Sequence, residues 1–191
     1  MQVPEHADIV TLDEAFDAVD RDTRVLVEGL SEALGTWRAQ PGSWSVAQCL
    51  DHLATGNRVY LAAMTPPAER ARAEGRRRRR PATPGAIGGF FVRMLEPPVT
   101  TRNTMRSPGA IRPRPSPSLA ETAASFLDTQ EDVHAFLRTY AAIDLAGVRF
   151  VNPFIPVVRF SLATGLHVLA AHARRHLWQA WRTRRAAESA I

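Results

Sequence analysis

The 191-residue sequence has one cysteine, Cys49, and no lysine, so that all 24 basic residues are arginine. A single cysteine excludes an internal disulfide and fits a reducing compartment. The lack of lysine, beside many alanines, is typical of a GC-rich bacterial genome. No apolar run approaches the ~20 residues of a membrane-spanning helix, and the acidic N-terminal stretch does not resemble a signal peptide. We therefore expect a cytoplasmic protein without a membrane segment.

Two kinds of catalytic motif are also missing. The sequence has no glycine-rich loop of the type that cradles phosphates, and no convincing serine, histidine and acid set for nucleophilic catalysis. What it does have is the composition of a globular protein, 45% hydrophobic and 23% charged. A chain of this length can bury a core without disulfides or a structural metal. We predict one domain over residues 1–191.

Apolar residues recur at helical spacing in four stretches. These predict helices over roughly 8–35, 45–64, 118–142 and 161–185. Ser45 with Gln48, and Ser118 with Glu121, have the spacing of a capping box, which predicts that helices begin there. Pro66-Pro67 is expected to stop the second helix. The sequence thus predicts a mainly helical protein.

Residues 66–117 differ in composition from the rest of the chain. They hold ten of the 14 prolines and the arginine run at residues 76–80. Short helices are predicted over 68–79 and 86–96, and the remainder is expected to be an extended loop. The run could contact an acidic partner or nucleic acid phosphates, but no aromatic platform or recognition helix accompanies it. We therefore interpret it as a solvated run on a mobile loop and do not expect nucleic acid binding.

Three histidines have a pattern that indicates a metal site. His172 and His176 are four residues apart, about 40° of rotation on a helix, so both imidazoles point the same way. They continue the apolar stripe of the last helix, and two buried imidazoles are costly unless hydrogen-bonded or bound to a metal. His52 continues an apolar face of the second helix. If the two helices are neighbours, three imidazoles converge and leave an open position on a divalent ion; an ordinary core histidine is the alternative for His52.

The remaining candidates are expected to lie outside such a site. His167 is about 140° round the helix from His172, so it should face elsewhere. His134 is expected at the edge of the third helix, and His6 in solvent. Cys49 lies one turn before His52, but we interpret it as a small buried apolar thiol rather than a ligand. The apolar segment 148–160, broken by two prolines, is predicted to be an extended connector packed on the core.

Two of these stretches carry a family likeness. Residues 43–53, SWSVAQCLDHL, resemble the second-helix signature of the DinB-like superfamily. In that signature a tryptophan precedes a capped helix that carries a metal-binding histidine. LHVLAAHARRHLWQA, residues 166–180, resembles the signature of its last helix, and PFIP before that helix is similar as well. The resemblance implies an all-α fold, a four-helix bundle with a long crossover between the second and third helices. The arginine-rich insertion fits it poorly.

The resemblance also implies a divalent metal, zinc or nickel, on His52, His172 and His176, and a homodimer. Some members of this superfamily are transferases or isomerases that use a low-molecular-weight thiol. One hypothesis is therefore a metal-dependent enzyme in which a small-molecule thiol attacks an electrophile. The alternative is a non-catalytic stress-response or binding module with a structural or vestigial metal site. Catalytic residues other than the metal ligands are not identified by the sequence.

Overall fold

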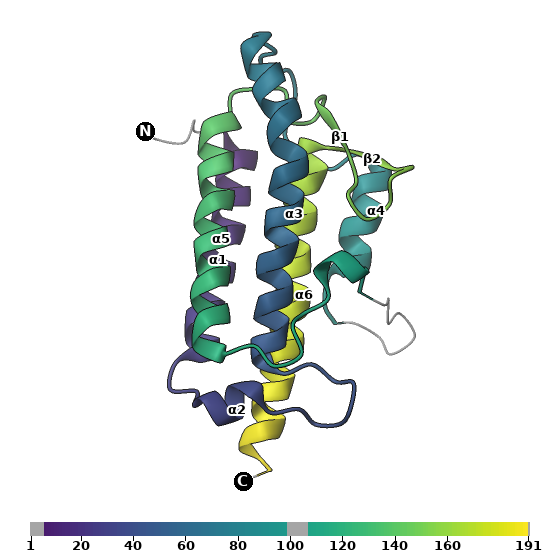
Figure 1. The fold of residues 1–191 in the computed structure, drawn as a ribbon. Coiled ribbons are helices and arrows are strands. Elements are labelled where there is room, and N and C mark those ends of the chain that lie inside the picture. The colour runs from purple at the N-terminus through teal and green to yellow at the C-terminus, as the bar shows by residue number, and fades with distance from the viewer. Residues whose placement is uncertain (1–5, 99–106, 191) are drawn as a thin grey trace.

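The computed structural model describes residues 6–98 and 107–190 and is mainly helical (Figure 1). Four long helices form its bundle: α1 (Ala7–Val27), α3 (Val46–Ala73), α5 (Leu119–Tyr140) and α6 (Leu162–Glu188). Both α1 and α3 pack against α5 and α6, so that α1 lies diagonally across from α3. The predicted all-α bundle is confirmed. Among the described residues, none of the helices is long and apolar enough to cross a membrane.

The two neighbours α3 and α5 run in the same direction, so the chain has to return the length of the bundle between them (Figure 1). This is the predicted long crossover. It contains α4 (Ala86–Leu95), which packs on α6, and the short 3-10 helix η1 (Gly109–Ile111), which lies against α3. The helix predicted over 86–96 is confirmed, whereas part of the predicted extended loop, residues 99–106, lies outside the described residues.

The N-terminal helix is shorter than predicted. It ends at Val27 rather than near Gly35, because Gly29 adopts a left-handed backbone with φ of 66°. A separate short helix, α2 (Glu32–Thr36), follows and is capped by the Ser31 side chain. The Glu32 carboxylate accepts a hydrogen bond from the Leu119 amide at 2.7 Å, which fixes α2 against the start of α5.

The prediction that Pro66-Pro67 stops the second helix is wrong, since α3 continues to Ala73. The short helix predicted over 68–79 is helical only as far as Ala73, as the last turns of α3, and residues 74–79 are not helical. Pro66 is exposed, so water can satisfy carbonyls that lose their helical partners there. On the other side of the helix, Met64, Ala68 and Ala71 are buried in the core. Burial of that face therefore maintains the helix through both prolines.

Elsewhere the helical patterns hold. Ser45 and Ser118 cap α3 and α5 as their positions predicted, and Ser161 caps α6. The connector before α6 forms a two-stranded antiparallel hairpin, β1 (Arg149–Val151) and β2 (Arg159–Ser161), in which Phe150 lies opposite Phe160. Both phenylalanines are buried, which agrees with a segment packed on the core.

The sequence predicts that the arginine run is solvated, but part of it is held against the bundle. Arg78 is partly buried, and its guanidinium donates to both carboxylate oxygens of Asp8 at 2.5 and 2.6 Å. Although burial raises the pKa of Asp8, hydrogen bonds from Arg78 and from the Ala82 amide hold it below its ordinary value. Arg77 pairs with Ile143 in an isolated β-bridge. The run therefore attaches the start of the crossover to α1 and to the segment after α5.

Candidate metal centre

His52 lies near the start of α3, where local contacts fix the helix. Ser45 accepts a hydrogen bond from the Gln48 amide, and the Gln48 side chain accepts one from the Ser45 amide. Gln48 Nε2 in turn donates to the carbonyls of Arg114 and Pro115, both at 3.1 Å. These bonds hold the end of the crossover against α3, next to the buried His52 ring.

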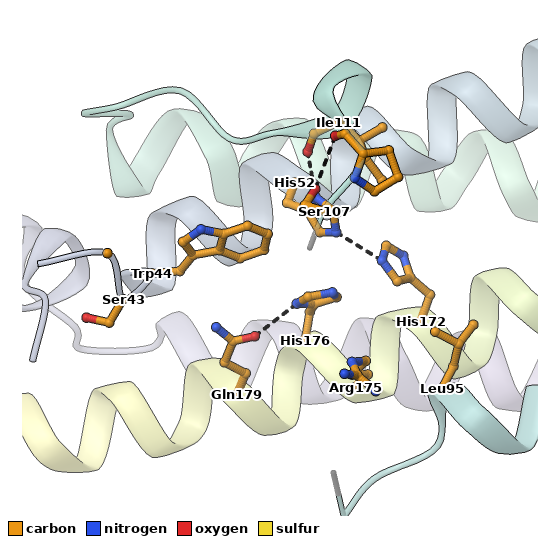
Figure 2. Close-up of a pocket in the computed structure, with 12 residues that line it drawn as sticks. Ser43, Trp44, His52, Leu95, Ser107, Ile111, His172, Arg175, His176 and Gln179 are labelled. Atoms are coloured by element: carbon orange, nitrogen blue, oxygen red, sulfur yellow. Dashed lines mark hydrogen bonds between the residues drawn. The ribbon is translucent and has the colours of Figure 1, made fainter. Parts of the chain in front are cut away.

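His172 and His176 project from α6 toward His52, as Figure 2 shows. The Nε2 atoms of His52 and His172 are 3.0 Å apart. One nitrogen from each of the three rings lies within 4.8 Å of the others. The predicted convergence of His52, His172 and His176 is confirmed, and we refer to these residues as the histidine cluster.

Two of the rings are oriented by hydrogen bonds on their outer nitrogen. His52 Nδ1 lies 2.6 Å from the Ile111 carbonyl oxygen, which can only accept, so Nδ1 carries the proton. His176 Nδ1 is 3.1 Å from Gln179 Oε1, which accepts in the same way. Each Nε2 is then left with a lone pair, and these lone pairs face the centre of the cluster. Metal-binding histidines are generally held by such outer hydrogen bonds.

Burial keeps the imidazoles of the cluster neutral. It lowers the pKa of His172 to about 3, an effect that the nearby His52 and Arg175 reinforce. Burial likewise lowers the pKa of His176 well below its ordinary value, and it also lowers the pKa of His52. At neutral pH the cluster therefore offers uncharged nitrogen donors, which is the form that binds a metal.

A cavity of about 340 Å³ opens beside the cluster. Trp44 forms one wall: its ring stacks on His176 at 5.5 Å between centroids and lies 4.8 Å from His52 (Figure 2). Arg175 also lines the cavity and donates to the Met94 carbonyl at 3.3 Å. None of the described residues that line it is acidic. The cavity therefore favours an anionic or neutral ligand over a cationic one.

These features fit a divalent metal. The donors are three neutral nitrogens, two of them oriented from outside. The 3.0 Å between the Nε2 atoms of His52 and His172 is short enough for both to reach one ion through metal–nitrogen bonds of about 2.0–2.1 Å. With three protein donors and an adjacent cavity, positions would remain for solvent or substrate. No other group of potential ligands of this kind occurs among the described residues.

The other candidates lie outside the cluster. Cys49 is fully buried, and burial raises the pKa of its thiol to about 12, in agreement with an inert core residue. His167 faces away from the cluster and lies 3.0 Å from the Ala82 carbonyl oxygen. His6 is exposed, as expected. The prediction for His134 is wrong: it is buried rather than at an edge, because Asp13 and Asp20 of α1 enclose its ring.

The sequence did not identify three contributors to the centre. Trp44 precedes the Ser45 cap of α3, so the helical period that indicates His52 does not apply to it. Arg175 is adjacent to His176, but the sequence does not show that its side chain reaches the cavity. The Ile111 carbonyl could not be predicted, because a backbone group in an aperiodic segment leaves no sequence signal.

A bundle of four long helices with a three-histidine cluster between α3 and α6 defines a class of candidate metal-binding helical proteins. The model of the DinB superfamily matches residues 15–180, and the chain belongs to this superfamily. Searches of curated proteins and of solved structures found no match to the chain.

Proposed function

We propose that His52, His172 and His176 bind one divalent metal, zinc or nickel, and that the protein is a metal-dependent enzyme acting on a low-molecular-weight thiol and an electrophile. The observation that carries this proposal is the convergence of three neutral imidazoles beside a cavity. Three nitrogen donors with open positions suit catalysis better than a closed structural site. Membership of the DinB superfamily supports the same proposal.

A bound metal would supply Lewis acidity that lowers the pKa of a coordinated thiol. The chain's own groups have complementary roles. The Ile111 carbonyl and Gln179 orient two rings, and Trp44 covers one side of the cluster. Arg175 adds positive charge to the cavity wall, which favours a thiolate over a thiol. Since no described cavity residue is acidic, no carboxylate base is available there, and this favours a nucleophile that ionises on binding.

The direct test is an assay of metal-loaded protein with a panel of small thiols, each paired with alkyl, epoxide and activated-alkene electrophiles. We expect thiol-dependent product formation with at least one pair. The His172→Ala variant should lose it, and the His167→Ala variant, whose ring faces away, should keep it.

Bound metal without thiol-dependent turnover across the panel would contradict the enzymatic part of this proposal. It would favour the alternative of a binding module with a structural metal. Failure of the wild-type protein to bind zinc or nickel would contradict the whole proposal.

A further inference from the structure

A second cavity, of about 280 Å³, lies between α3, α4, α6 and the β-hairpin. Unlike the first cavity, it is lined mainly by aromatic and aliphatic side chains, among them Phe91, Met94, Phe154, Ile155, Phe160 and Val168. Apolar walls of this kind favour an apolar group over water, because a water molecule inside needs two or more polar partners. We call this space the apolar cavity.

The apolar cavity adjoins the histidine cluster. Leu95, Pro108, Ile111 and His172 line both cavities. His172 thus presents one side of its ring to the cluster and another to the apolar cavity. Gly56 lines the apolar cavity beneath this ring, where a β-carbon would lie 3.5 Å from His172 Cε1. A molecule in the apolar cavity can therefore contact the cluster through His172.

The apolar cavity also has a polar contact contributed by Tyr60. The Tyr60 hydroxyl accepts a hydrogen bond from Asn152 Nδ2 at 3.3 Å. Asn152 Oδ1 in turn accepts from the amides of Phe154 and Ile155, so the amide is fixed by the hairpin. Burial raises the pKa of Tyr60, so its hydroxyl keeps its proton and can donate it to a ligand.

The size of the apolar cavity limits its occupant. An apolar protein cavity of about 150 Å³ accommodates benzene. The present cavity is nearly twice as large, which suits a fused two-ring aromatic or a branched aliphatic group. Charged groups are disfavoured, because none of the described lining residues supplies a counter-charge.

We infer that the apolar cavity binds an uncharged, compact apolar group of the substrate, aromatic or branched aliphatic, and so places the reactive end of that substrate beside His172. This inference rests on the proposed function for what happens at the cluster, but the binding itself does not require a metal. The electrophile is then the apolar substrate, while the more polar thiol occupies the cavity beside Trp44 and Arg175.

The test is a titration of 2-naphthol, an uncharged two-ring probe, into metal-free and metal-loaded protein, followed by NMR. We expect one bound molecule in both forms, with contacts to the Tyr60 and Phe160 rings. Val168→Phe places a ring in the cavity and should weaken binding about tenfold or more. Val157→Phe is the matched control, because Val157 is 92% exposed and lines neither cavity.

If Val168→Phe disturbs folding, Ile155→Trp fills the cavity from the hairpin, where the side chain is already 37% exposed. Equal affinity of wild type and a folded cavity-filling variant would overturn the inference, as would contacts to surface residues only. Binding of 2-naphthol to metal-free protein would support it even if the thiol assay fails. Metal binding and thiol turnover without 2-naphthol binding would refute the inference alone.

Discussion

Buried histidines occur on two sides of this bundle, and their neighbours give them opposite chemistry. His134 lies between α5 and α1, with Nδ1 2.7 Å from Asp13 Oδ1 and Nε2 3.5 Å from Asp20 Oδ2. These carboxylates, Asp20 most strongly, raise the pKa of His134 to about 9 against the effect of burial. The histidine cluster between α3 and α6 has carbonyl oxygens as its partners instead, and its pKa values are lowered.

The comparison shows that burial alone does not decide what an imidazole does. A protonated ring has no lone pair and can act only as a donor, so His134 joins α5 to α1 as an ion pair. A neutral ring whose outer nitrogen donates to a carbonyl or amide oxygen keeps a lone pair on the other nitrogen, as a metal ligand requires. His134 is distinguished by carboxylates at both of its nitrogens, which leave no nitrogen for a metal, whereas His52 and His176 have an oxygen acceptor on Nδ1 and keep Nε2 for the cluster.

The largest expected effect is on metal affinity. His172→Ala removes one of three donors, so zinc affinity should fall more than about 100-fold. This loss is larger than the one expected when only a hydrogen-bond partner of a ligand is removed. Circular dichroism should still show a helical protein that melts cooperatively, because the core does not depend on the metal. His167→Ala is the matched control on the same helix. Similar zinc contents of the two variants by elemental analysis would refute the ligand assignment.

A second prediction removes the structural histidine. His134→Ala leaves the carboxylates of Asp13 and Asp20 without their cation and should lower the free energy of unfolding by about 2 kcal/mol, less than for a fully buried pair because Asp13 is partly exposed. Urea denaturation measures this change, and zinc affinity should stay unchanged. A variant as stable as wild type would show that the ion pair contributes nothing.

The sequence predicted the cluster because its members follow the period of their helices. His172 and His176 share a face, and His52 continues the apolar face of α3, which packs directly on α6. His134 was misplaced because its partners come from α1, and the period of one helix does not show which charged residues of another helix lie against it. The acids of α1 had no predicted partner on α5.

Errors in the fold have a related cause. Pro66-Pro67 is a strong local signal for a helix end, but burial of Met64 and Ala68 on the opposite face outweighs it. The arginine run suggested a solvated segment, and only the fold shows that Arg78 reaches Asp8, 70 residues away in sequence. Tertiary contacts of this kind are not encoded in the local pattern.

A smaller effect is expected where the outer partner of a ligand changes. Gln179→Leu removes the acceptor for His176 Nδ1 and should weaken zinc binding about tenfold. Gln179→Glu should instead raise the pKa of His176 in the metal-free protein, because a carboxylate stabilises the protonated ring as Asp20 does for His134. Competition titration with a chromophoric chelator measures the first change. No difference between the leucine variant and wild type would contradict the orienting role of Gln179.

A further prediction concerns the pH dependence of stability. The pKa of His134 is about 9 in the folded protein against an ordinary value of 6.5, so its ion pair stabilises the fold fully below pH 6.5. This stabilisation should be lost progressively as the pH rises through about 9. His134→Gln should lack that part of the pH dependence. Thermal melts of both proteins across this pH range measure the difference. If the melting temperatures of the two proteins changed with pH in parallel, the raised pKa would be contradicted.

The opposite protonation of His134 and the histidine cluster can be measured by ¹⁵N NMR of histidine-labelled protein, recorded at about pH 7.5 before and after one equivalent of Zn²⁺. We expect both ring nitrogens of His134 to be protonated throughout, and the cluster rings to be neutral before zinc is added. Zinc should then shift the resonances of His52, His172 and His176 and leave those of His134 and His167 in place. Protonated cluster rings, or zinc shifts at His134 in place of the cluster, would contradict the account.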